Sequence, residues 1–130
     1  MVTRDTDYAI RALCCIAQAK EKVVSARYLT KELKIPRPFL RKILQILNKK
    51  KILKSYKGLG GGFSLAENIK NITVFDLVNI FQGPFALTEH KFKGKECPYT
   101  KRCKLKKRLD SIESDVIKKL RSINLADLLK

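Results

Sequence analysis

The sequence is poor in the groups that catalysis, secretion and membrane insertion need. It has one histidine and no tryptophan in 130 residues. It contains neither a nucleophile–base pair nor a GK[ST] phosphate loop. No apolar run approaches the ~20 residues of a membrane-spanning helix, and the start lacks the pattern of a signal peptide. These absences disfavour an enzyme, a secreted protein and a membrane protein.

Acidic residues are also scarce. There are 12 Asp and Glu against 29 Lys and Arg, which gives a formal net charge of +17, and the excess is larger in residues 1–66 than in residues 67–130. With 45% hydrophobic residues, the chain is too apolar for a disordered basic tail. The charge therefore predicts a folded domain with a polyanionic partner, nucleic acid first and an anionic membrane surface second. Four cysteines without a signal peptide favour a cytoplasmic location, where thiols stay reduced.

Three helices are predicted in the N-terminal part. Residues 3–19 carry one apolar stripe at helical spacing. Ser25 is a good N-cap for a short helix over residues 26–33. Pro36 and Pro38 suit the first turn of a third helix, which runs to about Lys49. Two short helices joined by a tight turn, behind a longer one, form a helix-turn-helix pattern.

A β-hairpin is predicted to follow. Strand-like residues 52–56 and 63–65 flank a loop with four glycines. Phe63 leaves the phosphate-binding pattern GxGxxG incomplete, so the alternatives are a simple turn that needs positive φ and a wing that lies on DNA. The predicted fold class is therefore mainly α, a winged helix-turn-helix with a β-hairpin wing and a long C-terminal dimerisation helix.

The third helix and the wing supply the candidate DNA contacts. Arginine pairs bidentately with guanine, and glutamine with adenine, in the major groove. Residues near the helix start most often reach the bases, so Arg37 and Arg41 are the predicted base contacts. Phe39 is either a core residue, which we favour, or a contact to sugar and thymine methyl. The predicted DNA-binding set is Ser25, Arg37, Phe39, Arg41, Lys42, Gln45, Lys57, Gly58, Gly60 and Gly61.

The C-terminal half begins with a capping box, Thr73 with Asp76, which predicts a fourth helix that ends at Gly83. Residues 85–99 lack periodicity and are predicted to be a loop. A long helix from about Thr100 carries an apolar seam formed by Leu105, Leu109, Ile112, Val116, Leu120 and Ile123. The seam either folds back on its own domain or pairs with a second copy, and pairing fits the paired half-sites of DNA-binding proteins. A last short helix is predicted over residues 125–129.

These elements divide the chain into three parts. Residues 1–83 form the winged-helix DNA-binding domain, residues 84–99 a cysteine-containing loop, and residues 100–130 the dimerisation helix with its short extension. Five blocks along the chain match a known pattern: residues 7–13, residues 35–44, residues 58–63, residues 72–84, and Cys97 with Cys103. In these blocks the sequence resembles the Rrf2 family of bacterial winged-helix transcription regulators. The resemblance implies a homodimeric DNA-binding regulator whose long C-terminal helix pairs the protomers.

The cysteines depart from the pattern of the cluster-binding members of this family. Those members have three cysteines spaced by five residues, whereas here Lys91, next to His90, occupies the position of the first. Lys106 stands where one member carries a histidine ligand. A [2Fe–2S] cluster normally has four protein ligands, and Cys97, Cys103 and His90 would supply at most three per chain.

Three interpretations of the pair Cys97 and Cys103 stay open. The pair is an inert remnant of the family loop, a thiol switch favoured by the surrounding cations, or an unusual metal or iron–sulfur site that includes His90. We expect no cofactor in protein purified in air. Cys14 and Cys15 are interpreted as small apolar filler of the first helix.

The sequence thus predicts a homodimeric regulator that binds specific double-stranded DNA and acts by repression. The alternative is a basic RNA- or ribosome-associated protein. That alternative explains the charge, but it does not explain the wing, the seam and the family blocks together.

Overall fold

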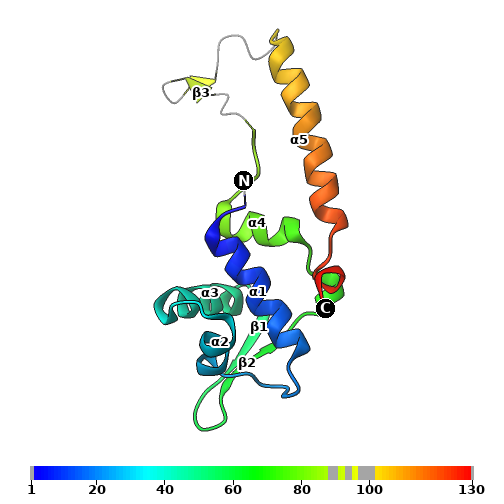
Figure 1. The fold of residues 1–130 in the computed structure, drawn as a ribbon. Coiled ribbons are helices and arrows are strands. Elements are labelled where there is room, and N and C mark those ends of the chain that lie inside the picture. Colours follow the sequence, from blue (N-terminus) through cyan, green and yellow to red (C-terminus); the bar gives the residue numbers. More distant parts are fainter. Residues whose placement is uncertain (1, 88–90, 93–94, 97–101, 130) are drawn as a thin grey trace.

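Three helices form the helix-turn-helix as predicted. The computed structural model describes residues 2–87, 91–92, 95–96 and 102–129, and it contains α1 (Arg4–Gln18), α2 (Ala26–Leu33) and α3 (Arg37–Lys49) (Figure 1). Ser25 caps α2, because its hydroxyl accepts a hydrogen bond from the backbone N of Tyr28 at 3.0 Å. Lys34 ends α2 with a φ of 55°, and α3 begins directly after Pro36.

The predicted hairpin is present and is fixed to the start of α2. Strand β1 (Leu53–Tyr56) pairs antiparallel with β2 (Gly62–Leu65), so that Tyr56 lies opposite Gly62. Val24 extends this ladder, since its N and O atoms each form a 2.8 Å hydrogen bond with Phe63. Gly62 is required here, because a Cβ would lie 2.3 Å from the Val24 carbonyl oxygen. The hairpin therefore emerges beside α2 and α3.

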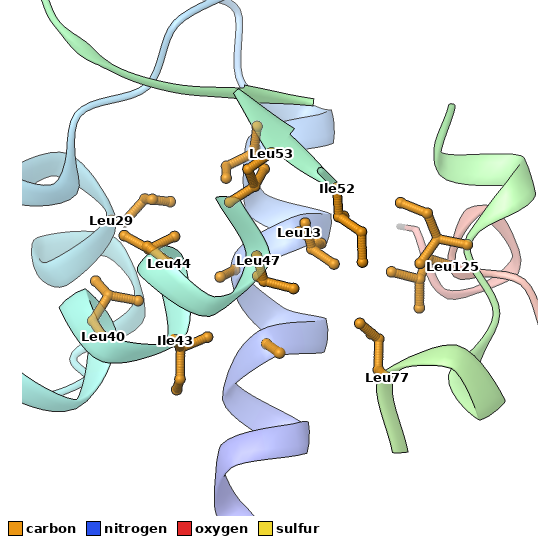
Figure 2. Packing of buried hydrophobic residues seen from close by; sticks show 14 of the residues in the cluster. Leu13, Leu29, Leu40, Ile43, Leu44, Leu47, Ile52, Leu53, Leu77 and Leu125 are labelled. Carbon is orange, nitrogen blue, oxygen red and sulfur yellow. The ribbon is translucent and has the colours of Figure 1, made fainter. Parts of the chain in front are cut away.

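One hydrophobic core joins the helix-turn-helix to the C-terminal part. Leu13 of α1 lies at its centre, with leucines of α2 and α3 on one side (Figure 2). Leu77 of α4 and Leu125 near the C-terminus close the other side, and both are fully buried. The labelled core residues are Leu13, Leu29, Leu40, Ile43, Leu44, Leu47, Ile52, Leu53, Leu77 and Leu125.

Helix α4 (Val74–Gln82) follows a short 3₁₀ turn, η1 (Ile69–Asn71). Its predicted capping box is present: the Thr73 hydroxyl accepts from the Asp76 N, and the Asp76 carboxylate accepts from the Thr73 N. Gly83 ends the helix with a φ of 79°. The last element, η2 (Leu125–Leu128), is a 3₁₀ helix and ends one residue earlier than the predicted helix.

The segment before the long helix differs from its prediction. Instead of a loop throughout residues 85–99, two short strands pair antiparallel, β3 (Lys91–Phe92) with β4 (Lys95–Glu96). Strands of two residues are too short to produce a detectable alternation. The long helix α5 (Lys104–Ser122) begins four residues later than expected, where the Cys103 Sγ accepts a hydrogen bond from the Lys106 N at 3.3 Å.

Helix α5 projects away from the winged domain, at the opposite end from the wing loop (Figure 1). Its predicted seam divides into two parts. Leu120 and Ile123 pack against the core of their own chain, whereas Leu105 is 65% exposed and Ile112 50% exposed. Arg121 also joins α5 to α4, with its guanidinium 4.4 Å from the centre of the Phe75 ring. No helix in the described part of the chain combines the length and apolarity that a bilayer crossing requires.

Candidate nucleic-acid interface

A groove of about 630 Å³ lies between the helix-turn-helix and the wing. Six of the ten residues predicted to contact DNA line it: Arg37, Arg41 and Gln45 from α3, and Lys57, Gly58 and Gly61 from the wing loop. The three α3 residues are spaced by four, so they follow one face of the helix. The structure therefore brings the predicted base contacts of α3 and three of the predicted wing residues to one surface.

The packing of α3 explains why its polar face is free. Its buried side chains, Leu40, Ile43, Leu44 and Leu47, fill the core between α1 and α2, which both contact this helix. Arg37, Arg41 and Gln45 are exposed on another face. Because burying a charge without a partner is costly, the sequence can place α3 in only one orientation.

The base of the wing is electropositive. The Ser64 hydroxyl donates to the Tyr56 hydroxyl at 3.3 Å, and the Lys54 Nζ lies 5.5 Å from the centre of the Tyr56 ring. The hydrogen bond from Ser64 lowers the pKa of Tyr56, and the charges of Lys54 and Lys22 act in the same direction. The two lysines place positive charge beside the wing, and positive charge attracts phosphate groups.

Four predicted contacts lie outside the groove. Ser25 uses its hydroxyl as the α2 cap, and it lines a neighbouring hollow of about 640 Å³ together with Gly60. Lys42 is exposed on α3 but does not line the groove. Phe39 is 44% exposed, with the Arg4 guanidinium 5.8 Å from its ring centre. The favoured interpretation of Phe39 as a core residue is therefore wrong, because its neighbour Leu40 occupies the core-facing position.

Sequence reasoning missed two polar groove residues on helices. Asn48 lies three residues after Gln45 and seven after Arg41, so the helical spacing already contained its signal. Arg27 lies in the first turn of α2, just after Ser25. Helix starts attract phosphate groups, and that signal could have identified Arg27. The polar strand residues Ser55 and Tyr56 also line the groove, and they were not predicted either.

Only one of the three candidate metal ligands is described. Cys103 is a half-buried free thiol at the start of α5, while Cys97 and His90 lie outside the described residues. Within residues 2–87 and 102–129, no three His, Cys, Asp or Glu side chains lie close enough to hold one metal ion. The described side chains therefore do not form the four-ligand set of a [2Fe–2S] cluster.

The two cysteines of α1 lie elsewhere, in a hollow between α1 and α2 that Tyr28 and Glu32 also line. Burial raises the pKa of Cys14, and the neighbouring Cys15 adds to the effect. Burial also raises the pKa of Cys15, followed by the charge of Glu32. Cys15 packs against the hydrophobic core, which agrees with its interpretation as apolar filler, whereas Cys14 lines the hollow and is partly exposed.

The fold and the groove together define a winged-helix nucleic-acid-binding protein. A family model described as "Rrf2: Iron-dependent Transcriptional regulator" matches residues 2–130. The chain belongs to the Rrf2 family. It is a DNA-binding transcriptional regulator and not an enzyme.

Relatives agree with this assignment. An HTH-type transcriptional regulator of Aquifex aeolicus is 40% identical over 82 residues, which cover 62% of this chain and 57% of that relative. The HTH-type transcriptional regulator NsrR of Oceanobacillus iheyensis is 27% identical over 127 residues, covering 96% of this chain and 86% of NsrR.

Solved structures show the same fold. CymR, the global cysteine regulator of B. subtilis, superposes with a TM-score of 0.76 at 22% identity, covering 98% of this chain and 95% of CymR. IscR of T. potens gives 0.74 at 23% identity, covering 98% of this chain and 85% of IscR. The predicted winged-helix fold is thereby confirmed.

Proposed function

We propose that this chain is a homodimeric repressor that recognises a specific DNA sequence. Helix α3 lies in the major groove, and the wing lies on the adjacent minor groove. The observation that carries the proposal is the single groove in which Arg37, Arg41 and Gln45 face the wing residue Lys57.

Base recognition is assigned to the first two turns of α3. Arg37 is the first residue of this helix and Arg41 lies one turn further, and both are exposed. A guanidinium forms two parallel hydrogen bonds with guanine, which discriminates against the other bases. Gln45 continues the same face toward an adjacent base. Lys42, at the side of this face, is assigned to the phosphate backbone, as are Arg27 and Lys57.

Dimerisation is assigned to the exposed part of the α5 seam. The core of the chain covers Leu120 and Ile123, but no described element covers Leu105 or Ile112. A second α5 would bury these side chains, together with the partly exposed Leu109 and Val116. Two copies would then present two α3 helices to a pseudo-palindromic site.

Repression follows from occupancy. A dimer bound at its DNA site would act by covering that site, so that other proteins could not bind there. Cys97 and Cys103 are the proposed sensing residues, either as a pair of thiols or as ligands of an iron–sulfur cluster. The family description as iron-dependent supports a metal-linked signal, and we expect protein purified in air to carry no cofactor.

The experiment that tests DNA recognition is selection from a random duplex library with the full chain. We expect a pseudo-palindromic consensus whose binding weakens steeply with salt, because several phosphates are neutralised. An RNA hairpin library serves as the control for the alternative of an RNA-binding protein. Equal affinity for all duplexes, or preferential recovery of RNA, would contradict the proposal.

A further inference from the structure

Leu59 forms the apex of the wing. The backbone N of Gly61 donates to the Gly58 oxygen at 3.0 Å, and Gly60 has a φ of +74°. This is the arrangement of a type II turn with Leu59 in its second position, where the side chain points outward. Leu59 is 107% exposed, more than any other large apolar side chain in the described part of the chain.

The hairpin itself gives no reason for an apolar side chain at this position. The turn needs the positive φ of Gly60, but its second position accepts polar residues equally well. Other exposed apolar side chains are at least one-third covered, including Leu105 at 65% exposure. Leu59 thus has no cover within its own chain, and its whole side chain is available to a partner.

We propose that Leu59 is an apolar wedge, which enters the minor groove beside each half-site and partly unstacks a base step. The inference rests on the proposed function, because it assumes that the wing lies on DNA. Lys57 is two residues before Leu59 and lines the groove with α3, so its charge can hold the adjacent phosphates. Leucine is among the side chains that proteins insert between base steps, which bends the duplex toward the major groove.

The neighbours of Leu59 allow the approach. Gly58 and Gly60 flank it, and a Cβ built at either position meets no atom within 4 Å. The space beside the leucine is therefore open on both sides, and the backbone can come close to the sugar edges. A wedge also selects sequence, since flexible pyrimidine–purine steps deform most easily, and guanine places an amino group in the minor groove. The wing should therefore favour A·T pairs at the base step where Leu59 inserts.

The first test measures affinity and bending on the duplex selected by the wild-type chain, with fluorophores at the two ends. We expect Leu59→Ala to weaken binding about tenfold, because it removes buried apolar surface, and to reduce the bend. Leu59→Met keeps a flexible apolar side chain and should restore both quantities. Leu128→Ala is the matched control, since Leu128 is also exposed but belongs to η2, and it should behave as wild type.

The second test changes the DNA at the wing step. Replacing A·T with G·C should weaken wild-type binding and leave Leu59→Ala unaffected, whereas inosine·C, which lacks the amino group, should restore wild-type binding. If Leu59→Ala binds and bends the duplex as wild type does, or if the amino group has the same effect on both proteins, the wedge is refuted. If the wild-type chain selects no duplex, the proposed function itself is refuted.

Discussion

The Thr6 hydroxyl donates a hydrogen bond of 2.8 Å to the Gln82 side-chain oxygen, and the Thr3 backbone N donates to the same oxygen at 2.9 Å. Thr6 lies in the first turn of α1, and Gln82 is the last residue of α4. Thr6 is fully buried, so this bond satisfies a hydroxyl that water does not reach. The contact fixes the end of α4, where the chain departs toward residues 84–99, against the helix that supports α3.

We expect Gln82→Leu to lower the free energy of unfolding by about 1–3 kcal/mol, because it removes the acceptor that the buried Thr6 hydroxyl shares with the Thr3 backbone N. The Thr3 hydroxyl, 3.1 Å away, is then the remaining partner of the Thr6 hydroxyl. Urea denaturation measures the loss. Asn79→Ala is the control, since Asn79 is exposed on the same helix and should change little. The double variant Thr6→Val with Gln82→Leu should recover part of the stability. Additive losses would contradict a direct coupling of the two side chains.

Substitution of either arginine should reduce sequence specificity, whereas substitution of Lys57 should reduce the affinity for every duplex. Arg37→Ala and Arg41→Ala should each lose about 1–3 kcal/mol on the selected duplex and relax its discrimination. Lys57→Ala should weaken all duplexes similarly and reduce the salt slope by about 0.9. Fluorescence anisotropy at several salt concentrations separates the two patterns, with Lys118→Ala on α5 as a cation control. Equal losses on selected and random DNA would remove the arginines as base contacts.

The exposed part of the α5 seam predicts that two chains form a dimer. Ile112→Asp should give a monomer by analytical ultracentrifugation, because an unpaired charge in a buried interface is strongly unfavourable. Operator affinity should fall with it, since the two half-sites are no longer bound together. Ser114→Asp adds the same charge on the opposite face of α5 and should leave the assembly unchanged. An Ile112→Asp protein with the assembly of wild type would show that the seam does not pair protomers.

A redox response should depend on Cys103. Diamide would accept two electrons and two protons from Cys97 and Cys103, which would join them as a disulfide and change operator affinity. Cys103→Ser should abolish this response, while Cys14→Ser should not. If the pair binds a cluster instead, protein prepared without oxygen should be coloured, and His90→Ala should remove the colour. Colourless protein whose binding ignores both diamide and chelators would leave the pair inert.

The α1 thiols should react in a pH-dependent way. Because their pKa values are raised, the reactive thiolate is scarcer at any given pH than in an ordinary cysteine. Iodoacetamide should therefore label Cys14 and Cys15 more slowly than glutathione at pH 8, and the rate should still rise above pH 9. Tandem mass spectrometry of tryptic peptide 12–20, which holds both cysteines, gives the rate at each site. Labelling as fast as that of glutathione at pH 8 would contradict the effect of burial.

The local elements could be predicted from the sequence. Ser25 and the Thr73–Asp76 box act within one turn of their own helices, and Pro36 and Pro38 restrict the backbone at the start of α3, so these boundaries follow from neighbours in the chain. The apolar face of α3 was also readable, because burial of Leu40 and Leu44 at helical spacing leaves Arg37 and Arg41 outside. The winged helix and most of its proposed DNA-binding residues could therefore be predicted.

The way in which these elements pack together could not be predicted from the sequence. Helical periodicity identifies an apolar seam, but it does not show which residues cover that seam. In the structure, Leu120 and Ile123 pack against the core, whereas Leu105 is exposed. Phe39 lies outside the core because Leu40 and Ile43 occupy the core-facing side of α3. The bond between Thr6 and Gln82 joins residues 76 positions apart, and no local rule contains it. Such contacts depend on how side chains from many segments fill the same volume. The sequence of one segment therefore does not predict them.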